Sequence, residues 1–129
     1  MANPRIQPNL PRPVEPLAFP QVQILDVTGP LQVFATTNDI AGCNVSPYAI
    51  HVVSQAGGAV ASSSGMELLA HPLPPQGSAL DTLIVAGGPG IEAAAADEAL
   101  VTGCEDVHTR HAGSLPFAPA RSCWRRSRG

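Results

Sequence analysis

A short apolar run that ends in a glycine-rich turn places the strongest constraint on the fold of this chain. Residues Leu83–Ala86 are continuously apolar, and Gly87–Gly90 reads Gly-Gly-Pro-Gly. The stretch that begins at Ile91 is rich in alanine, which has high helix propensity. A strand without polar alternation is typical of a parallel sheet that is covered on both faces. The segment therefore predicts a strand, a tight turn and a helix in an α/β protein.

The first half of the chain predicts further elements of the same kind. Val14–Phe19 is expected to form the first, central strand, shortened or damaged because Pro16 removes a backbone donor. A helix is expected to start near Gly29, with Pro30 at its first position, where a missing N–H costs nothing. The β-rich alternation of Tyr48–Ser54 predicts another strand.

Shorter signals complete the pattern. Gly57-Gly58 is predicted to be a turn, and Ser64-Gly65 the tip of a small hairpin. In the helices, Leu31, Phe34 and Ile40 are expected to face the core, and Asp97 to cap a second helical segment. The order strand, helix, strand, hairpin, strand, helix predicts a doubly wound, flavodoxin-like α/β sandwich.

Composition limits the chain to one domain of 129 residues. Six of its 14 prolines lie in the first 20 residues, so segment 1–16 is expected to be extended or disordered. No apolar run approaches the ~20 residues of a membrane span, and no signal peptide opens the chain. These features predict a cytoplasmic protein with no membrane partner.

The charge distribution changes abruptly at Thr102. Eight acidic and two basic residues precede it, whereas five arginines and two acids follow it. The acidic body argues against nucleic-acid binding by this chain. Segment 102–129 has no apolar periodicity and ends in Pro, Arg and Ser, so it is interpreted as an aberrant tail.

The genetic code indicates why the tail differs. When the third base of each codon is read with the first two bases of the next, segment 112–125 can encode Arg-Ile-Ala-Ser-Val-Cys-(Ser/Thr)-Gly-Ala-Phe-Leu-Leu-Ala. Only one base of each shifted codon is free, which makes so long a fit improbable by chance. This hidden reading describes a strand, a sharp turn with a cysteine, and a helix. We therefore expect that the reading frame shifts near Thr102.

Three readable segments resemble one superfamily. They are "FPQVQILDVTGPLQVF" (Phe19–Phe34), "SSSGMELLA" (Ser62–Ala70) and "DTLIVAGGPG" (Asp81–Gly90). Together they resemble the PfpI-like, class I glutamine-amidotransferase-like proteins, and most closely the GlxA type, in which this domain precedes an AraC-type DNA-binding domain. The resemblance covers Phe19–Val101, and implies a partial PfpI-like domain at 17–101 that is incomplete at the C-terminus.

The resemblance implies three catalytic positions. Asp26 matches the acidic partner, and Gly87 and Gly88 match the turn whose backbone N–H groups form an oxyanion hole. On local sequence alone, Asp26 would rather be a capping or turn residue and the glycines an ordinary turn. The nucleophile is absent, because Phe117–Pro119 occupies its place in this frame.

No metal or cofactor is expected. Cys104, His108 and His111 would share one face of a helix, but they lack a fourth ligand and lie in the suspect tail. Cys43 and Cys123 are spaced for neither a disulfide framework nor a zinc knuckle.

The resemblance predicts a ligand-sensing, regulatory domain of a GlxA-type transcriptional regulator. This chain is expected to be an inactive fragment that lacks both the turn with the nucleophilic cysteine and the DNA-binding domain. Its expected partners are a small metabolite and a second copy in a homodimer. The alternative is a stand-alone PfpI-like thiol hydratase or hydrolase that resembles isonitrile hydratase. A product without activity that folds poorly is the third reading.

Overall fold

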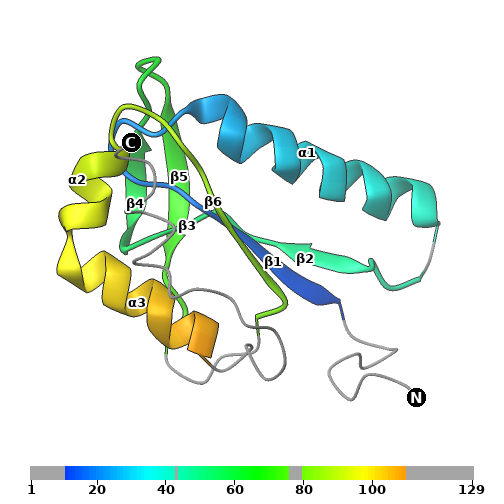
Figure 1. The fold of residues 1–129 in the computed structure, drawn as a ribbon. Coiled ribbons are helices and arrows are strands. Elements are labelled where there is room, and N and C mark those ends of the chain that lie inside the picture. The colour runs from blue at the N-terminus through cyan, green and yellow to red at the C-terminus, as the bar shows by residue number, and fades with distance from the viewer. Residues whose placement is uncertain (1–10, 43, 76–79, 110–129) are drawn as a thin grey trace.

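Strand β1 (Arg12–Leu17) lies inside the sheet of this protein, as the computed structural model shows (Figure 1). The structure describes residues 11–42, 44–75 and 80–109. The other elements follow β1 in the order α1 (Ile24–Ala41), β2 (Tyr48–Ile50), β3 (Val53–Ser54), β4 (Ala56–Ala61), β5 (Glu67–Pro72), β6 (Thr82–Val85), α2 (Ile91–Ala96) and α3 (Glu98–Thr109).

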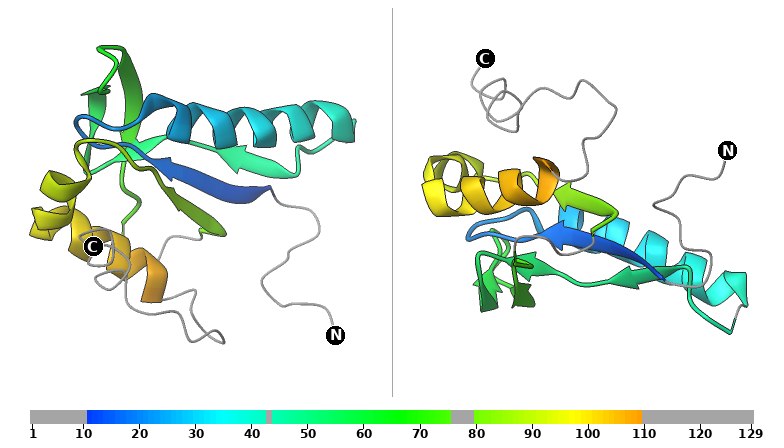
Figure 2. Two further views of the ribbon diagram at one scale, coloured as in Figure 1. Left: turned by 45° about the horizontal axis from the view of Figure 1, so that its top comes forward. Right: turned by 90° about the horizontal axis from the view of Figure 1, so that it is seen from below.

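The sheet is mixed, with a parallel centre. On one side β1 pairs with β6, and on the other with β2 and then β3, all in parallel. β3 pairs with β5 in parallel, and β5 forms an antiparallel hairpin with β4. In Figure 1, α1 runs above the sheet and α3 below it, and Figure 2 gives two further views of this arrangement. The doubly wound α/β fold expected from the sequence is confirmed.

The expectation of a damaged first strand is wrong. β1 has six residues, and Pro16 lies within it opposite Ile84 of β6. One absent hydrogen bond costs about 0.5–1.5 kcal/mol, whereas full burial of a Val or Leu side chain contributes about 1.5–3 kcal/mol. Val14 and Leu17 are both completely buried, so burial outweighs the missing donor. Residues 12–16 are therefore extended, as one of the two expectations had it, and their place in the sheet excludes disorder there; residues 1–10 lie outside the described part.

Helix α1 also differs from its prediction, since it begins at Ile24 and not near Gly29. Pro30 consequently lies inside the helix, where it cannot donate to the carbonyl of Asp26. Val27 is completely buried in the first turn and holds this end of the helix against the sheet. Tertiary burial thus extends the helix across a proline that the local sequence would place at its start.

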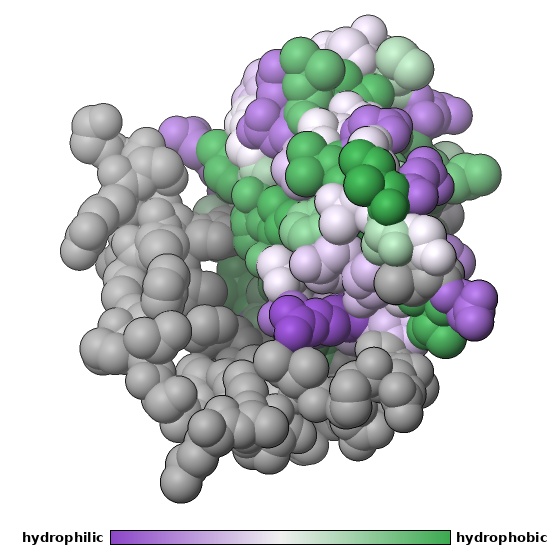
Figure 3. Space-filling model, turned by 90° about the vertical axis from the view of Figure 1, so that its right-hand side faces the viewer, coloured by the Kyte–Doolittle hydropathy of each residue, from purple (hydrophilic) through white to green (hydrophobic). Residues whose placement is uncertain are grey.

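The far end of α1 points away from the core. Ile40 is 80% exposed, so its predicted contact with the core is wrong. Figure 3 shows that apolar and polar residues intermingle on this side of the molecule. Asn38 connects this end of the helix to the sheet. Its Nδ2 donates a hydrogen bond of 2.9 Å to the carbonyl of Tyr48, and its Oδ1 accepts one of 3.0 Å from the N–H of Tyr48.

Two of the other strand and turn predictions need correction. The predicted strand Tyr48–Ser54 is divided between β2 and β3, with a break at 51–52. Gly57 and Gly58 lie within β4 and not in a turn, although both have a positive φ. The hairpin around Ser64-Gly65 is confirmed by the antiparallel pairing of β4 and β5.

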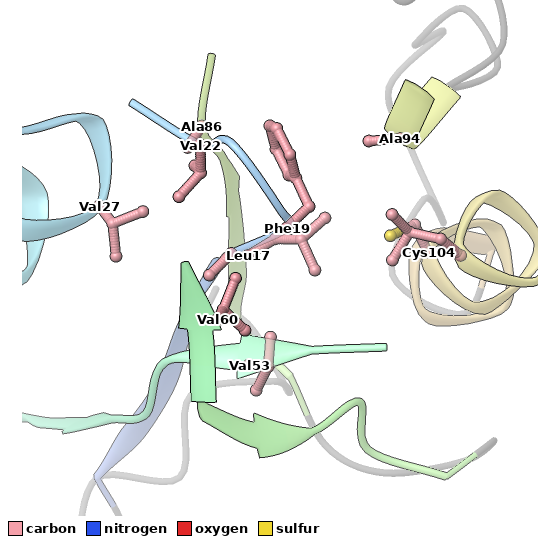
Figure 4. Close-up of a cluster of buried hydrophobic side chains, with 11 residues drawn as sticks. Leu17, Phe19, Val22, Val27, Val53, Val60, Ala86, Ala94 and Cys104 are labelled. Atoms are coloured by element: carbon pink, nitrogen blue, oxygen red, sulfur yellow. The ribbon is translucent and has the colours of Figure 1, made fainter. Parts of the chain in front are cut away.

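The C-terminal helix joins the core beyond the expected break. α3 continues through Thr102 to Thr109, so the first eight residues of the segment interpreted as an aberrant tail are helical; residues 110–129 lie outside the described part. Leu100 and Cys104 are buried one helical turn apart. Figure 4 shows Cys104 and Val27 of α1 on opposite sides of Leu17 and Phe19.

Candidate functional site

The loop after β1 meets the turn after β6 at the carboxyl ends of two neighbouring parallel strands. The N–H of Gly87 donates a hydrogen bond of 2.9 Å to Oδ2 of Asp26. The two residues are 61 positions apart in the chain. In doubly wound sheets, ligands bind at such an edge, where neighbouring connections leave the sheet in opposite directions. This contact is the centre of the candidate site.

Backbone hydrogen bonds lock the two segments together. The N–H of Gln23 donates to the carbonyl of Gly87 at 2.9 Å, and the N–H of Gly90 donates to the carbonyl of Gln21 at 3.1 Å. Asp26 lies in the first turn of α1, where a negative charge interacts favourably with the helix dipole. The position of the carboxylate is therefore fixed by the helix start and by the opposite turn together.

Two glycines allow this close approach. Gly88 has a φ of 127°, and a Cβ atom on it would overlap the backbone nitrogen of Gln23. A Cβ atom on Gly90 would overlap the carbonyl oxygen of Pro20. Gly88 was predicted as a site residue from the sequence, and Gly90 was not, although the same requirement for close packing of the backbone applies to both glycines.

Gln21 is a second residue of this junction that the sequence did not predict. Its φ is +64°, and among the described residues it alone combines a positive φ with a side chain larger than hydrogen. Such a conformation is rare outside glycine, asparagine and aspartate. The backbone of Gln21 bonds both Ala61 in β4 and Gly90, which holds it in this strained geometry. No local signal in the sequence announces it.

The backbone N–H of Gly87 is bonded to the carboxylate of Asp26, so it is not free to stabilise an oxyanion. Asp26 is exposed, so its carboxylate can also accept hydrogen bonds from a molecule in solution. An oxyanion at Gly87 would compete with this carboxylate for the same N–H and would be repelled by its charge. The structure thus brings Asp26 and Gly87 together, with Gly88 next in the turn, while their catalytic roles stay a prediction.

The one cysteine that the structure describes is not at this site. Cys104 lies in α3, is 4% exposed and packs in the hydrophobic core. Burial, with a smaller contribution from Glu105, raises the pKa of its thiol to about 11. A nucleophilic cysteine needs the opposite shift. Cys43, Cys123 and the segment 117–119 lie outside the described residues.

The described residues offer no metal centre. They contain no group of three or more His, Cys, Asp or Glu side chains that could hold a metal ion. The side chains of His108 and His111 lie outside the described part, so the declined zinc hypothesis is not decided. In the same part of the chain, no helix has the length and apolar character required to cross a membrane.

Comparisons with known proteins give matches only in structure, since no family model and no curated protein matches the chain. A ThiJ/PfpI family protein from Pseudomonas syringae is similar with a TM-score of 0.64 and 21% identity, over 83% of this chain and 43% of that one. An AraC family transcriptional regulator from Pseudomonas putida has a TM-score of 0.53 and 22% identity, over 77% and 70%.

A third similar structure is DJ-1beta from Drosophila melanogaster, with a TM-score of 0.53 and 18% identity, over 72% of this chain and 47% of that one. The chain thus spans less than half the length of two of these structures. At such identities the likeness concerns the fold. This protein has the α/β fold of the ThiJ/PfpI proteins.

Proposed function

We propose that this chain is a PfpI-like ligand-sensing domain of the kind found in GlxA-type transcriptional regulators, and that it has no thiol catalysis of its own. The contact between Asp26 and Gly87 carries the proposal. It keeps the carboxylate of Asp26 at the edge of the sheet. It also occupies the N–H of Gly87, which would have to be free to stabilise an oxyanion. Such a site suits binding better than acyl transfer.

The state of Cys104 supports a binding role. A thiol with a pKa of about 11 is almost wholly protonated at neutral pH, and the thiolate is the reactive form. The similar structure from Pseudomonas putida is an AraC family transcriptional regulator, which supports a regulatory context. We further propose that a small metabolite is the ligand, that the domain acts as a homodimer, and that this chain does not itself bind nucleic acid.

The proposed ligand follows from the charge at the site. An exposed carboxylate attracts cations and accepts hydrogen bonds from N–H donors. We expect small amines and amides to raise the melting temperature of the purified chain, and carboxylic acids of the same size to leave it unchanged. Asp26→Asn removes the charge but keeps an oxygen acceptor, so it should abolish the effect of amines and weaken that of amides.

Asp39→Asn is the matched control, since Asp39 is exposed on the same helix. Equal melting-temperature shifts in Asp26→Asn and in wild type would contradict ligand binding at this site.

The alternative function, a thiol hydratase or hydrolase, makes a different prediction. It requires saturable isonitrile hydration or hydrolysis by the purified chain, lost after treatment with iodoacetamide. We expect no such turnover. Detection of such turnover would show that the chain is a thiol enzyme and would contradict the proposed sensing role.

We also propose that the reading frame changes near Thr102 and that the hidden Val-Cys-(Ser/Thr)-Gly turn belongs to the original gene. The codon fit over segment 112–125 supports this. The nucleotide sequence tests it directly: the third-base frame should stay open through the cysteine codon. A stop codon in that frame before the cysteine would exclude the frame change. A continuing frame that encodes helix-turn-helix units would favour the regulator.

A further inference from the structure

The sheet contains a buried carboxylate that the proposed function does not use. Glu15 lies in β1 and is 9% exposed, and its Oε2 atom has no hydrogen-bond partner among the residues that the structure describes. Burial of an ionised carboxylate costs free energy unless a donor or a cation compensates it. Glu15 therefore requires either a bound proton or a nearby positive charge.

Two imidazoles lie on the same face of the sheet as Glu15. Leu17 pairs with Val53, and Val53 pairs with His71, so these side chains and Glu15 project to one side. The ring of His51 contacts that of His71 edge to face, with 5.1 Å between the ring centroids. Both histidines are exposed.

Other charged groups near this face do not compensate Glu15. Asp81, just before β6, is exposed and accepts a hydrogen bond from Thr82. From α3 come Glu105, which is also negative, and Cys104, whose thiol stays neutral because burial raises its pKa to about 11. Arg12 lies on the opposite face of β1 by strand alternation. Within the described residues, the imidazoles are the cations that this face can present.

The electrostatics of Glu15 have a definite sign. Burial raises the pKa of Glu15 above its ordinary value of 4.5, and the charge of His71 acts in the opposite direction and lowers it. An acid with a raised pKa stabilises the fold fully below the pKa of the unfolded chain, and this contribution is lost as pH rises through the folded value. Histidines in general lose their charge between pH 5 and 8. Both effects therefore weaken the fold as pH increases.

We propose that Glu15, His51 and His71 form a proton-operated latch that holds β1 in the sheet in acid and loosens it above neutral pH. In acid, Glu15 is neutral or faces a positively charged imidazole; in base, it is buried, ionised and uncompensated. β1 pairs with β2, β3 and β6 (Figure 1) and leads into the loop that bonds Gly87, so loosening of β1 reaches the candidate site. The latch does not depend on the sensing role.

The test is urea unfolding of the full chain between pH 4.5 and 8.5. As pH rises from 4.5 to 8.5, the ratio of folded to unfolded protein should fall in wild type, because the raised pKa of Glu15 makes its ionisation less favourable in the folded state. Glu15→Gln, which cannot ionise, should flatten this fall. Glu67→Gln is the matched control, because Glu67 is exposed on β5, and it should behave as wild type.

A second variant distinguishes the effect of the imidazole charge from the effect of side-chain packing. His71→Gln removes the compensating charge, so its folded-to-unfolded ratio should be lower than that of wild type at pH 6 and equal to it at pH 8.5. Relative to the intrinsic exchange rate at each pH, the amides of Val14, Glu15 and Leu17 should lose protection as pH rises in wild type and keep it in Glu15→Gln. If Glu15→Gln does not fold, Glu15→Leu gives the same comparison. A wild-type slope in the Glu15 variant, or an equal loss at both pH values in His71→Gln, would overturn the latch.

Discussion

Single residues in this protein act mainly through backbone geometry. Gly88 and Gly90 allow the turn after β6 to touch the loop after β1, and Gln21 accepts a strained φ of +64° within that loop. Asp26 adds a side-chain contact to the same junction. The candidate site is therefore built from backbone approach first and from one carboxylate second.

Two glycines should respond differently to the same substitution. Gly29 lies in α1, and apart from its chain neighbours no atom lies within 4 Å of an added Cβ. Because the ring of Pro30 disfavours a Cβ on the helical residue before it, the gain in helix propensity is offset, and Gly29→Ala should change the free energy of unfolding by less than about 1 kcal/mol. Gly88→Ala places a Cβ against the backbone of Gln23 at a φ of 127° and should cost at least about 2 kcal/mol. Urea unfolding of both variants measures this. Equal effects of the two substitutions would mean that the turn does not approach the loop as described.

The bond from Gly87 to Asp26 should make a measurable contribution to stability. Asp26→Ala removes the acceptor, and a loss of about 1 kcal/mol is expected, because the carboxylate is exposed and water partly replaces it. Asp26→Asn keeps an oxygen acceptor and should lose less than about 0.5 kcal/mol. The free energy of unfolding in urea, with Asp39→Ala as control, gives the comparison. Wild-type stability of Asp26→Ala would show that this contact is not formed in solution.

At the scale of elements, short local signals and long-range packing act together. The junction between α2 and α3 depends on Asp97, whose Oδ1 accepts hydrogen bonds from the N–H groups of Ala99 and Leu100 at 3.1 and 3.2 Å. This confirms the capping role expected from the sequence. α1, in contrast, passes through Pro30 because its first turn is buried.

Removal of the cap should weaken α3 in particular. Asp97→Ala is expected to cost about 1 kcal/mol, whereas Asp97→Ser keeps an oxygen acceptor and should restore most of that loss. Hydrogen exchange at the amides of Ala99 and Leu100 should become faster in Asp97→Ala. Unchanged exchange at these two amides would argue against capping by Asp97.

For the whole molecule, one hydrophobic core joins the sheet to helices on both of its sides. Leu17, Phe19 and Val53 from the sheet region pack with Val27 of α1 and Cys104 of α3 (Figure 4). Because Cys104 is 4% exposed, its reactivity reports whether α3 stays docked.

Alkylation of Cys104 should therefore follow unfolding. Iodoacetamide should label the Cys104 peptide at pH 7.5 at least on the order of a hundredfold more slowly in the native protein than in urea, since the thiol is buried and protonated. Peptide mapping by mass spectrometry separates Cys104 from the other cysteines. Similar rates with and without urea would mean that α3 does not cover the sheet.

The sequence by itself determined the elements whose causes lie within a few residues. The apolar run before the glycine-rich turn predicted β6 and α2, Ser64-Gly65 predicted the hairpin, and Asp97 predicted the cap. In each case the structure depends on hydrogen bonds between residues close in sequence or on residue propensities, so the local sequence is sufficient to predict it. The order of these elements was then sufficient to predict the doubly wound sheet.

Only the tertiary structure decided the features whose partners are distant in the chain. Burial kept Pro16 in β1 and Pro30 in α1, because apolar surface removed from water outweighs a single lost hydrogen bond. Past Thr102, the burial of Cys104 holds α3 against the core. The resemblance to PfpI-like proteins assigned Asp26 and Gly87 to one site, without a bond between them, whereas local sequence favoured an ordinary cap and turn. The two residues meet across 61 positions because the parallel strands that precede them end side by side.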